Sequence, residues 1–411
     1  AHLGGYPEED WGIRSRKVRS TLVLSPCYEV RKYKDFEFNL RELAGSMGDF
    51  GTLFPLAIGY IVVNGIDPVG LFVMMGLVNI ASGLVYRLPM PVEPKKLIAV
   101  TAIAQEWPAS MVYASGLGLG ITWFLLVFTG LLRKIVEWTP LFVVRGIQLA
   151  LGAMLAWQGL KMMHTTPWLG LVAVVIVLLL RQNRYAPAAI VLMILGVGII
   201  AWRGELGRAL EPAITLPPLT VPRLEDVWKA MLLAGFAQLP LSITNAVMAT
   251  AALIRDYFPD KPVTERQLML NMGFMNVIPA FFGGMPMCHG AGGLAGQYYF
   301  GARTGGTNIL EGLIEICLGL FLGKSLHNLL VAFPLAIVGG MMFLVGIELL
   351  KVVKGLQGWG AWIAILTAAI SLISNMAVGF AAGMVAASLV RHLRHRGILS
   401  CACHKPQLAQ T

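Results

Sequence analysis

Long stretches of this chain contain no charged residue at all. Leu169–Leu180 and Ala361–Ile373 are two examples, and similar apolar segments recur along most of the sequence. Only 13% of the 411 residues are charged, whereas about a quarter of the residues of an ordinary soluble domain carry a charge. A helix needs about 20 apolar residues to cross the hydrocarbon core of a bilayer. We therefore expect an all-α polytopic membrane protein with about 12–14 spans, some of them short or broken, and not a soluble enzyme.

The net charge of +10 is concentrated outside the apolar segments. Basic residues gather ahead of the first segment, after the last one and in three short connections: Arg14, Arg16, Lys17, Arg19, Arg31, Lys32, Lys34, Arg391, Arg394, Arg396, Arg133, Lys134, Arg181, Arg184, Lys351 and Lys354. The cytoplasmic loops of membrane proteins carry an excess of Lys and Arg. Because both tails are basic, we expect both termini to be cytoplasmic. Membrane topology explains the charge, and we expect no nucleic-acid partner.

The five cysteines do not form a recognisable metal motif. Cys401 and Cys403, followed by His404, lie near the end of the sequence. A structural zinc site needs about four ligands, and one short motif of this kind lacks the second pair. We therefore expect neither a metal site nor a cofactor.

The apolar pattern predicts seven membrane elements, a polar link at 204–228, and seven more elements. The first set is expected at 43–63, 68–86, 89–106, 110–132, 138–160, 167–180 and 186–202. The second set is expected at 229–253, 266–282, 285–301, 308–322, 326–349, 359–373 and 376–390.

The two sets share short motifs. Three of them occur in the same order and at nearly constant spacing: Leu43–Gly45 with Leu233–Gly235, Met75–Asn79 with Met272–Asn276, and Met90–Pro91 with Met285–Pro286. Three matches in register indicate an internal repeat. Since seven is odd, the second copy would enter the membrane from the opposite face. Inverted repeats with interrupted helices are typical of secondary transporters, so the repeat predicts a transporter and not a receptor or an intramembrane enzyme.

The third element of each set is strongly broken. Pro89 and Pro91 keep the first one extended, and Pro94 suits the first turn of a helix. The second one places Pro286 ahead of a glycine-rich start at His289–Gly293. An extended segment followed by a half-helix leaves free N–H groups inside the membrane, and these must face protein, water or a ligand.

Two such half-helix N-termini, coming from inverted copies, would point toward each other across a central cavity. Each carries roughly half a positive charge and free N–H donors, which together make an anion site. Pro94 opens the first half-helix, while Gly290, Ala291 and Gly292 would let a ligand approach the second backbone closely. Small residues can also serve tight helix packing. We favour the anion site.

Polar side chains near the half-helices are the candidate ligands. Lys95 and Lys96 could attract an anion or could extend toward the cytoplasmic face. Gln238, Ser242 and Asn245 lie in the opposing element and could hydrogen-bond an oxyanion, although contact between helices is the ordinary role of such side chains. Of these three, Gln238 is the preferred ligand.

Three titratable residues are candidates for a coupled proton. Asp49 lies within the first span, where it could relay a proton or cap a broken helix. Glu93 precedes the first half-helix, and His289 opens the second, where a structural histidine is the alternative. A dianion entering a negative cell faces about 2.3 kcal/mol per charge per 100 mV, so uptake needs coupling or a steep gradient. The sequence does not choose among the three.

Three segments resemble the molybdate-transporter family, a branch of the sulfate-permease superfamily: Glu42–Thr52, Pro89–Lys95 and Pro286–Gly306. The resemblance implies the seven-plus-seven fold shared with uracil and sulfate permeases, and high-affinity uptake of molybdate by alternating access. Cys288 and His289 stand where a nucleobase permease would suggest a carboxylate, which disfavours a nucleobase. The alternative is a sulfate or general oxyanion permease, because sulfate and molybdate share charge and shape.

The resemblance also implies a division of the chain. A transport core would comprise 39–132 and 229–323, and a gate or scaffold 133–203 and 324–391. Cytoplasmic tails at 1–38 and 392–411 and the linker at 204–228 would complete the chain. The expected partners are molybdate, with tungstate or sulfate as analogues, the lipid bilayer, and a second copy bound through the gate.

Overall fold

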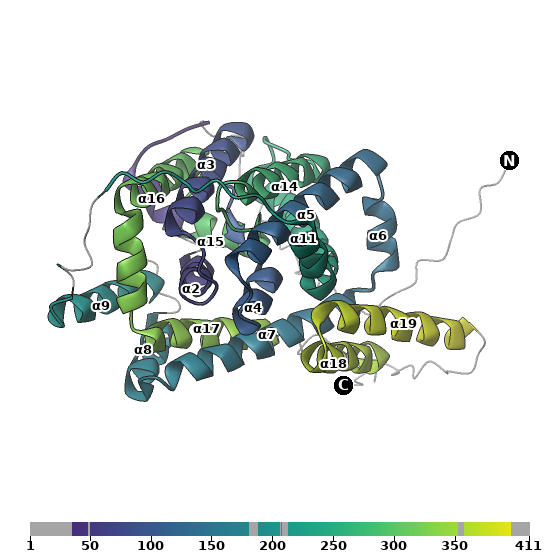
Figure 1. Cartoon of the computed structure of the whole chain (residues 1–411). Coiled ribbons are helices and arrows are strands. Elements are labelled where there is room, and N and C mark those ends of the chain that lie inside the picture. The colour runs from purple at the N-terminus through teal and green to yellow at the C-terminus, as the bar shows by residue number, and fades with distance from the viewer. Residues whose placement is uncertain are drawn as a thin grey trace, which may run out of the picture. The chain divides into compact units, whose positions relative to one another are not determined.

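A computed structural model of the chain describes residues 35–47, 50–180, 188–205, 207, 213–351 and 357–395. These residues are mostly helical, with one ladder of two short strands. Figure 1 shows the arrangement of the helices.

The elements fall into two runs along the chain. The first run comprises α1 (Leu40–Ser46), α2 (Phe50–Val62), α3 (Pro68–Tyr86), β1 (Glu93–Pro94), α4 (Lys96–Ala104), α5 (Ala109–Thr129), α6 (Leu132–Trp138), α7 (Leu141–Met163), α8 (Pro167–Leu180) and α9 (Ala188–Trp202). The second comprises α11 (Leu224–Ala230), η2 (Met231–Gly235), α12 (Phe236–Ser242), η3 (Ile243–Ala249), α13 (Thr250–Tyr257), α14 (Glu265–Ala280), β2 (Met287–Cys288), α15 (Ala291–Phe300), α16 (Gly306–Ala332), α17 (Leu335–Leu350), α18 (Gly358–Ile373) and α19 (Met376–His395). Here η2 and η3 are π-helical turns.

Most helices coincide with the expected membrane elements. Helices α3 and α8 begin and end at the expected residues, 68–86 and 167–180. In the described part of the chain, five helices are long and apolar enough to cross a membrane, and five shorter apolar helices accompany them. Large apolar side chains such as Phe128 and Ile373 are 74% and 86% exposed, as side chains that face lipid are. The chain is a multi-pass membrane protein.

One expected boundary is wrong. The apolar pattern predicts a break between 308–322 and 326–349, but α16 continues without interruption from Gly306 to Ala332. The chain turns instead at Pro334, because proline disfavours a helical conformation at the residue before it, and Phe333 is extended (ψ 133°). The short helix α6 is a further element that the pattern does not predict.

Glycines bring α3 and α16 into backbone contact. A methyl group on Gly76 would lie 2.5 Å from the carbonyl oxygen of Gly312, and one on Gly83 would lie 2.6 Å from that of Gly305. The two pairs are one heptad apart and run in opposite chain directions, so the helices are antiparallel. Close backbone approach through small residues is a main source of helix association in membranes.

Helices α7 and α17 pack in the same manner. A methyl group on Gly159 would lie 2.6 Å from the carbonyl oxygen of Gly339, and one on Gly152 would lie 2.9 Å from that of Gly346. Figure 1 shows this pair running beneath α2 and α4. Helix α4 contacts α7, and α2 contacts α17. The α7–α17 pair therefore packs against the helix of the first broken element.

A third contact concerns the recurring motif Met75–Asn79 and Met272–Asn276. A methyl group on Gly120 of α5 would lie 2.9 Å from the carbonyl oxygen of Gly273, the counterpart of Gly76. Both copies of the motif therefore place their glycine at a helix–helix contact. The complete seven-plus-seven inverted repeat stays a prediction.

The segment ahead of α1 is attached to the ends of other helices. Lys261 Nζ lies 3.0 Å from one carboxylate oxygen of Asp35, and Arg87 Nη1 lies 3.1 Å from the other. The hydrogen bond and charge of Lys261, together with Arg87, lower the pKa of Asp35 below its ordinary value. The backbone carbonyl of Asp35 also accepts a hydrogen bond from Gly305 N. These contacts hold the start of α1 near the start of α16.

We predict that Gly312→Ala destabilises the protein, because the added methyl group overlaps the Gly76 carbonyl and the two helices must separate. Overpacking of this kind lowers the free energy of unfolding by about 1–3 kcal/mol. The measurement is the unfolding temperature of detergent-purified protein, followed by tryptophan fluorescence. Gly198→Ala in α9 is the control, since a methyl group there meets no atom within 4 Å. Equal unfolding temperatures for the two variants would contradict the packing argument.

Candidate functional site

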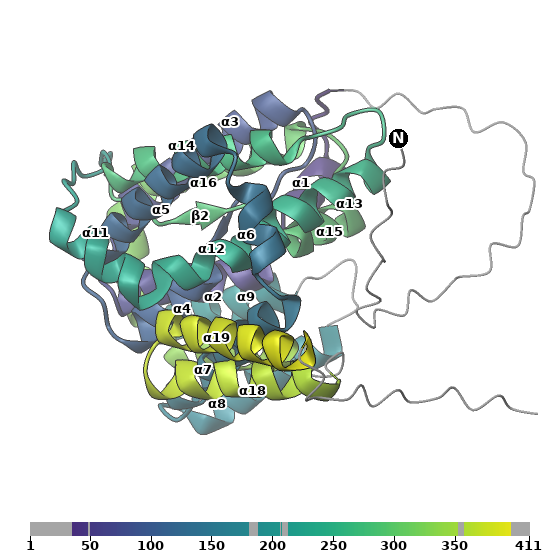
Figure 2. The same cartoon turned by 90° about the vertical axis from the view of Figure 1, so that its right-hand side faces the viewer.

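The two broken elements meet in an antiparallel ladder. Strand β1 pairs with β2, with Glu93 opposite Cys288 and Pro94 opposite Met287. One residue further, Lys95 N donates to Pro286 O at 2.9 Å. Figure 2 shows β2 within the group formed by α5, α12, α14 and α16. The extended conformation follows from the prolines, which remove N–H donors and disfavour helix at the preceding residues.

Each strand leads directly into a half-helix. Helix α4 begins three residues after Glu93, and α15 begins three residues after Cys288. Their N-cap residues, Lys95 and Gly290, are both extended and give no side-chain cap. Because the strands are antiparallel, the two helices start at the ladder and leave it in opposite directions. The predicted pair of half-helix N-termini is therefore present at one place in the fold.

A buried asparagine holds the backbone of each broken element. The Asn276 side chain accepts from Met287 N at 3.0 Å and donates to Met287 O at 2.8 Å. The Asn308 side chain accepts from Met90 N at 2.8 Å and donates to Met90 O at 2.6 Å. Both side chains are at most 1% exposed. They satisfy backbone groups that would otherwise be unpaired inside the membrane, at a cost of several kcal/mol each.

Further buried side chains orient Asn308. Its amide donates to Asn79 Oδ1 at 2.8 Å, and Asn79 Nδ2 donates to Glu315 Oε2 at 2.9 Å. Asn79 and Asn276 are the last residues of the two matched motifs, and each precedes its clamped methionine by eleven positions. Asn276 reaches the strand directly, whereas Asn79 acts through Asn308.

Gln238 lies at the start of α4, as expected, but its amide already has partners. Its carbonyl oxygen accepts from Leu97 N at 3.1 Å, and its Nε2 donates to Ser242 Oγ at 2.8 Å. Gln238 therefore supplies the missing cap of α4, and Ser242 fixes its orientation. Asn245 lies in η3 and is half-buried. Gln238 and Ser242 lie in α12, which also contains Pro240 and is flanked by the π-helical turns η2 and η3.

Lys95 is the most unusual side chain of the site. It is fully buried, and its Nζ has no hydrogen-bond partner among the described residues. The nearest compensation is the ring of Trp123, whose centroid lies 5.4 Å from Nζ. Such a cation–π contact contributes about 0.5–2 kcal/mol, which is small beside the cost of burying an unpaired ammonium group. An anion at the half-helix would supply the missing partner.

Glu93 and Lys96 form an ion pair beside Lys95. Lys96 Nζ lies 3.0 Å from Glu93 Oε2, and the two side chains are 25% and 2% exposed. Adjacent lysines therefore have different environments: Lys96 contacts a carboxylate, whereas no carboxylate of the described residues is hydrogen-bonded to Lys95 Nζ. Pro94, between Glu93 and Lys95, belongs to the ladder and carries no donor.

His289 directly follows β2 and is fully buried. Its Nδ1 lies 3.0 Å from Pro91 O, and since a carbonyl only accepts, Nδ1 carries the hydrogen. Its Nε2 has no hydrogen-bond partner in the described part of the chain. The ring also meets Tyr86 edge-on at 5.7 Å. His289 thus ties the two broken elements together and leaves one nitrogen available.

The remaining predicted residues are Gly290, Ala291, Gly292 and Asp49. Gly290 is buried, Ala291 is half-buried and Gly292 is exposed, with no atom within 4 Å of a methyl group built on it. Asp49 lies outside the described residues, so its place in the site stays a prediction.

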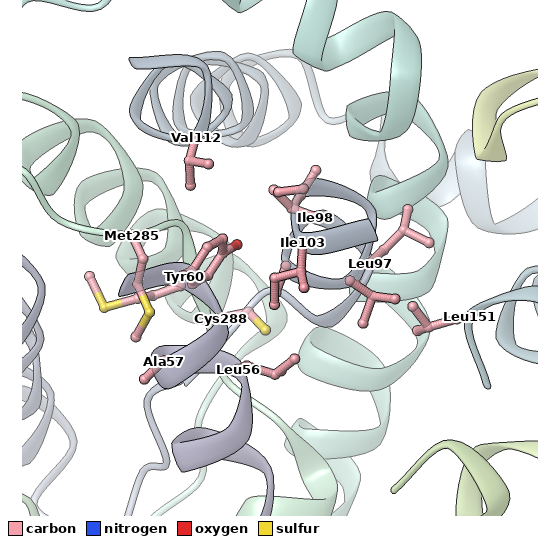
Figure 3. Packing of buried hydrophobic residues seen from close by; sticks show 14 of the residues in the cluster. Leu56, Ala57, Tyr60, Leu97, Ile98, Ile103, Val112, Leu151, Met285 and Cys288 are labelled. Carbon is pink, nitrogen blue, oxygen red and sulfur yellow. The ribbon is translucent and has the colours of Figure 1, made fainter. Parts of the chain in front are cut away.

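Apolar side chains cover one side of the ladder. Figure 3 shows Cys288 between Leu56 and Tyr60 of α2 and the α4 side chain Ile103. These side chains are all buried. Apolar surroundings lower the effective dielectric constant, so a charge entering here would interact more strongly with the half-helix ends.

Sequence reasoning missed several residues of the site. Trp123 beside Lys95 and Asn308 beside Met90 are far from the broken elements in sequence, and no local signal marks them. Gln297 in α15 is fully buried, and neither of its amide atoms has a hydrogen-bond partner among the residues described. A polar residue in an otherwise apolar half-helix is the signal that could have found it.

Comparison with known proteins places relatives beside this chain. A family model described as "Molybdate transporter of MFS superfamily" matches residues 41–155 and 230–349. Molybdate transporter 1 of Arabidopsis thaliana is 32% identical over 399 residues, which cover 85% of this chain and 87% of that protein. The matched ranges contain both halves of the ladder and both clamping asparagines.

Solved structures show the fold. The transmembrane domain of the cyanobacterial bicarbonate transporter BicA superimposes with a TM-score of 0.62 at 16% identity, covering 84% of this chain and 97% of that one. Murine solute carrier 26 family member A9, an anion transporter, superimposes with a TM-score of 0.67 at 14% identity, covering 88% and 70%. The sulfate-permease-like fold expected from the sequence is confirmed.

We predict that Asn276→Leu lowers the unfolding temperature, because it leaves Met287 N and O without partners. Each buried unsatisfied group costs about 1–3 kcal/mol. The control is Asn271→Leu on the same helix, since Asn271 is half-buried and its bond to Ser82 Oγ is long, at 3.2 Å. The two variants are compared by thermal unfolding in detergent. If Asn271→Leu lowered the unfolding temperature as much as Asn276→Leu does, the hydrogen bonds of Asn276 to Met287 would have no special role.

Proposed function

The chain belongs to the molybdate transporter family, and we propose that it carries molybdate across a membrane by alternating access, with the oxyanion bound between the N-termini of α4 and α15. It is a transporter and not an enzyme in this proposal. The substrate assignment is supported by the relative of Arabidopsis thaliana named as a molybdate transporter, with which the chain aligns over most of both lengths.

The observation that carries the proposal is the buried amine of Lys95 beside two half-helix N-termini. Free N–H groups, helix dipoles and an ammonium group that has no hydrogen-bond partner within the described residues make a site that favours an anion. No cation is needed as a cofactor, since the protein supplies the positive charge itself. Gln238 would contribute by fixing the first turn of α4 and not by binding the oxyanion through its carbonyl.

Alternating access requires that one part of the protein moves against another. The expected core contains the ladder and both half-helices, and the expected gate contains α7 and α17. The contact between α4 and α7 is apolar, and Figure 3 shows Leu97 of α4 facing Leu151 of α7. An apolar contact of this kind suits sliding. In this proposal both termini are cytoplasmic and the gate forms the dimer contact.

Sulfate is the alternative substrate, because it has the same charge and tetrahedral shape as molybdate and is smaller. The electrostatic part of the site does not discriminate between them. Discrimination must come from the size of the space between the half-helices, which the larger oxyanion fills.

The first test is binding of molybdate to the purified full-length protein by titration calorimetry, with sulfate, tungstate and uracil as competitors. We expect tungstate to compete, uracil not to compete, and excess sulfate to compete weakly. Equal competition by sulfate would assign the protein to the general oxyanion permeases. No binding of any oxyanion would refute the proposed function.

We predict that Lys95→Met weakens molybdate binding about 10-fold to 100-fold, because a hydrogen bond to a charged group contributes about 1.5–3 kcal/mol. Lys161→Met is the matched control. Lys161 also lies over a tryptophan ring, with its Nζ 6.0 Å from the centroid of Trp157, but both side chains are exposed. Unchanged affinity in Lys95→Met would remove this amine from the site.

A further inference from the structure

The carboxylate of Glu93 occupies the end of the second half-helix. A methyl group built on Gly290 would lie 2.9 Å from Glu93 Oε2, and one built on Gly293 would overlap Oε1. Glycine is needed at both positions because the carboxylate fills the space that side chains would take. The Glu93 residue is 1% exposed, so its carboxyl group is buried against the positive end of α15.

The charges of the site are therefore unequal at its two ends. Helix α4 begins beside Lys95 and Lys96, whereas α15 begins against Glu93. Lys96 is already paired with Glu93 at 3.0 Å, so the three side chains together carry one net positive charge. A dianion carries two negative charges. With Glu93 ionised, one of these charges has no partner; with Glu93 neutral, the two lysines match the dianion.

Gln297 is a partner for the neutral form of Glu93. It follows Gly293, which lies against Glu93, by four residues, so it lies one turn further along the same face of α15. Its amide is buried and both of its polar atoms lack hydrogen-bond partners within the described residues. A carboxylic acid and a primary amide are complementary, since each offers one donor and one acceptor to the other. A carboxylate offers acceptors only and suits Lys96 instead.

We propose that Glu93 is a built-in anion of the empty site, which takes up one proton when the oxyanion enters, leaves the end of α15 and is received by Gln297. This inference rests on the proposed function and adds how transport of the oxyanion is coupled to a proton. The proton comes from the solution on the side where the oxyanion binds, and no bond other than O–H forms. One dianion and one proton then cross together, so each transport event moves one negative charge instead of two.

Other titratable groups face Glu93 from the neighbouring elements. Lys95 follows on its own strand, Lys96 lies on α4, and Cys288 and His289 lie on and after β2. Tyr60 of α2 lies near Cys288 (Figure 3). Glu93 is the group whose ionised form competes directly with the substrate for the helix end. His289 is the strongest rival, because its Nε2 is buried without a hydrogen-bond partner in the described structure.

The test counts protons taken up per molybdate bound. The full-length wild-type protein is titrated with molybdate by calorimetry in buffers of different ionisation enthalpy at one pH. We expect uptake of about one proton in the wild type. We expect Glu93→Gln to bind molybdate without proton uptake, because the amide imitates the neutral acid. Glu225→Gln is the matched control: Glu225 is also paired with a lysine, Lys229, at 2.6 Å, but its side chain is 75% exposed.

Three results would overturn the proposal: proton uptake that persists in Glu93→Gln, uptake that disappears in His289→Asn while Glu93 is intact, or wild-type binding without proton uptake. If Glu93→Gln does not fold, infrared difference spectra of the wild type decide instead. Molybdate should remove a carboxylate band and create a protonated carboxyl band, and their absence would refute the proposal. Wild-type protein that binds no molybdate would refute the proposed function itself, which separates the two failures.

Discussion

Every backbone N–H and C=O group inside a membrane must find a partner, and this requirement governs the centre of the structure. Two proline-rich segments interrupt helices there and would leave their polar groups unpaired. The β1–β2 ladder satisfies some of them, and the side-chain amides of Asn276 and Asn308 satisfy those of Met287 and Met90. Glycine contacts between α3 and α16 bring Asn308 close enough to act. The packing of α3 against α16 thus helps to support the extended segments.

The two half-helix ends look alike in backbone geometry but differ in chemistry. The end of α4 is capped by Gln238 and carries the isolated amine of Lys95, whereas the end of α15 holds the carboxylate of Glu93. A symmetric pair of dipoles would attract an anion equally at both ends. In the mechanism we propose, the end of α4 receives the oxyanion, and Glu93 occupies the end of α15 until its carboxylate takes up a proton.

Much of the fold follows from local pattern. Charge-free segments predict the membrane, and prolines with glycines predict both broken elements close to where they occur. The site is less predictable, because side-chain direction depends on where a helix starts. Lys95 and Lys96 are neighbours in sequence, yet one is buried beside Trp123 and the other pairs with Glu93. Gln238 stays a predicted ligand, and no local pattern indicates that its carbonyl accepts a hydrogen bond from Leu97 N at the start of α4.

The sequence by itself determined the membrane class, the two interruptions and the family, since each depends on residues close together in the chain. Only the tertiary structure decided that Asn308 holds Met90, that Trp123 lies beside Lys95 and that Glu93 fills the end of α15. These partners come from segments far apart in sequence, and the helix contacts that bring them together leave no local pattern. The break at Pro334 has a local cause, because proline disfavours a helical conformation at Phe333, whereas only the structure shows that α16 runs unbroken past residue 324, with Gly319 and Gly323 in contact with α3.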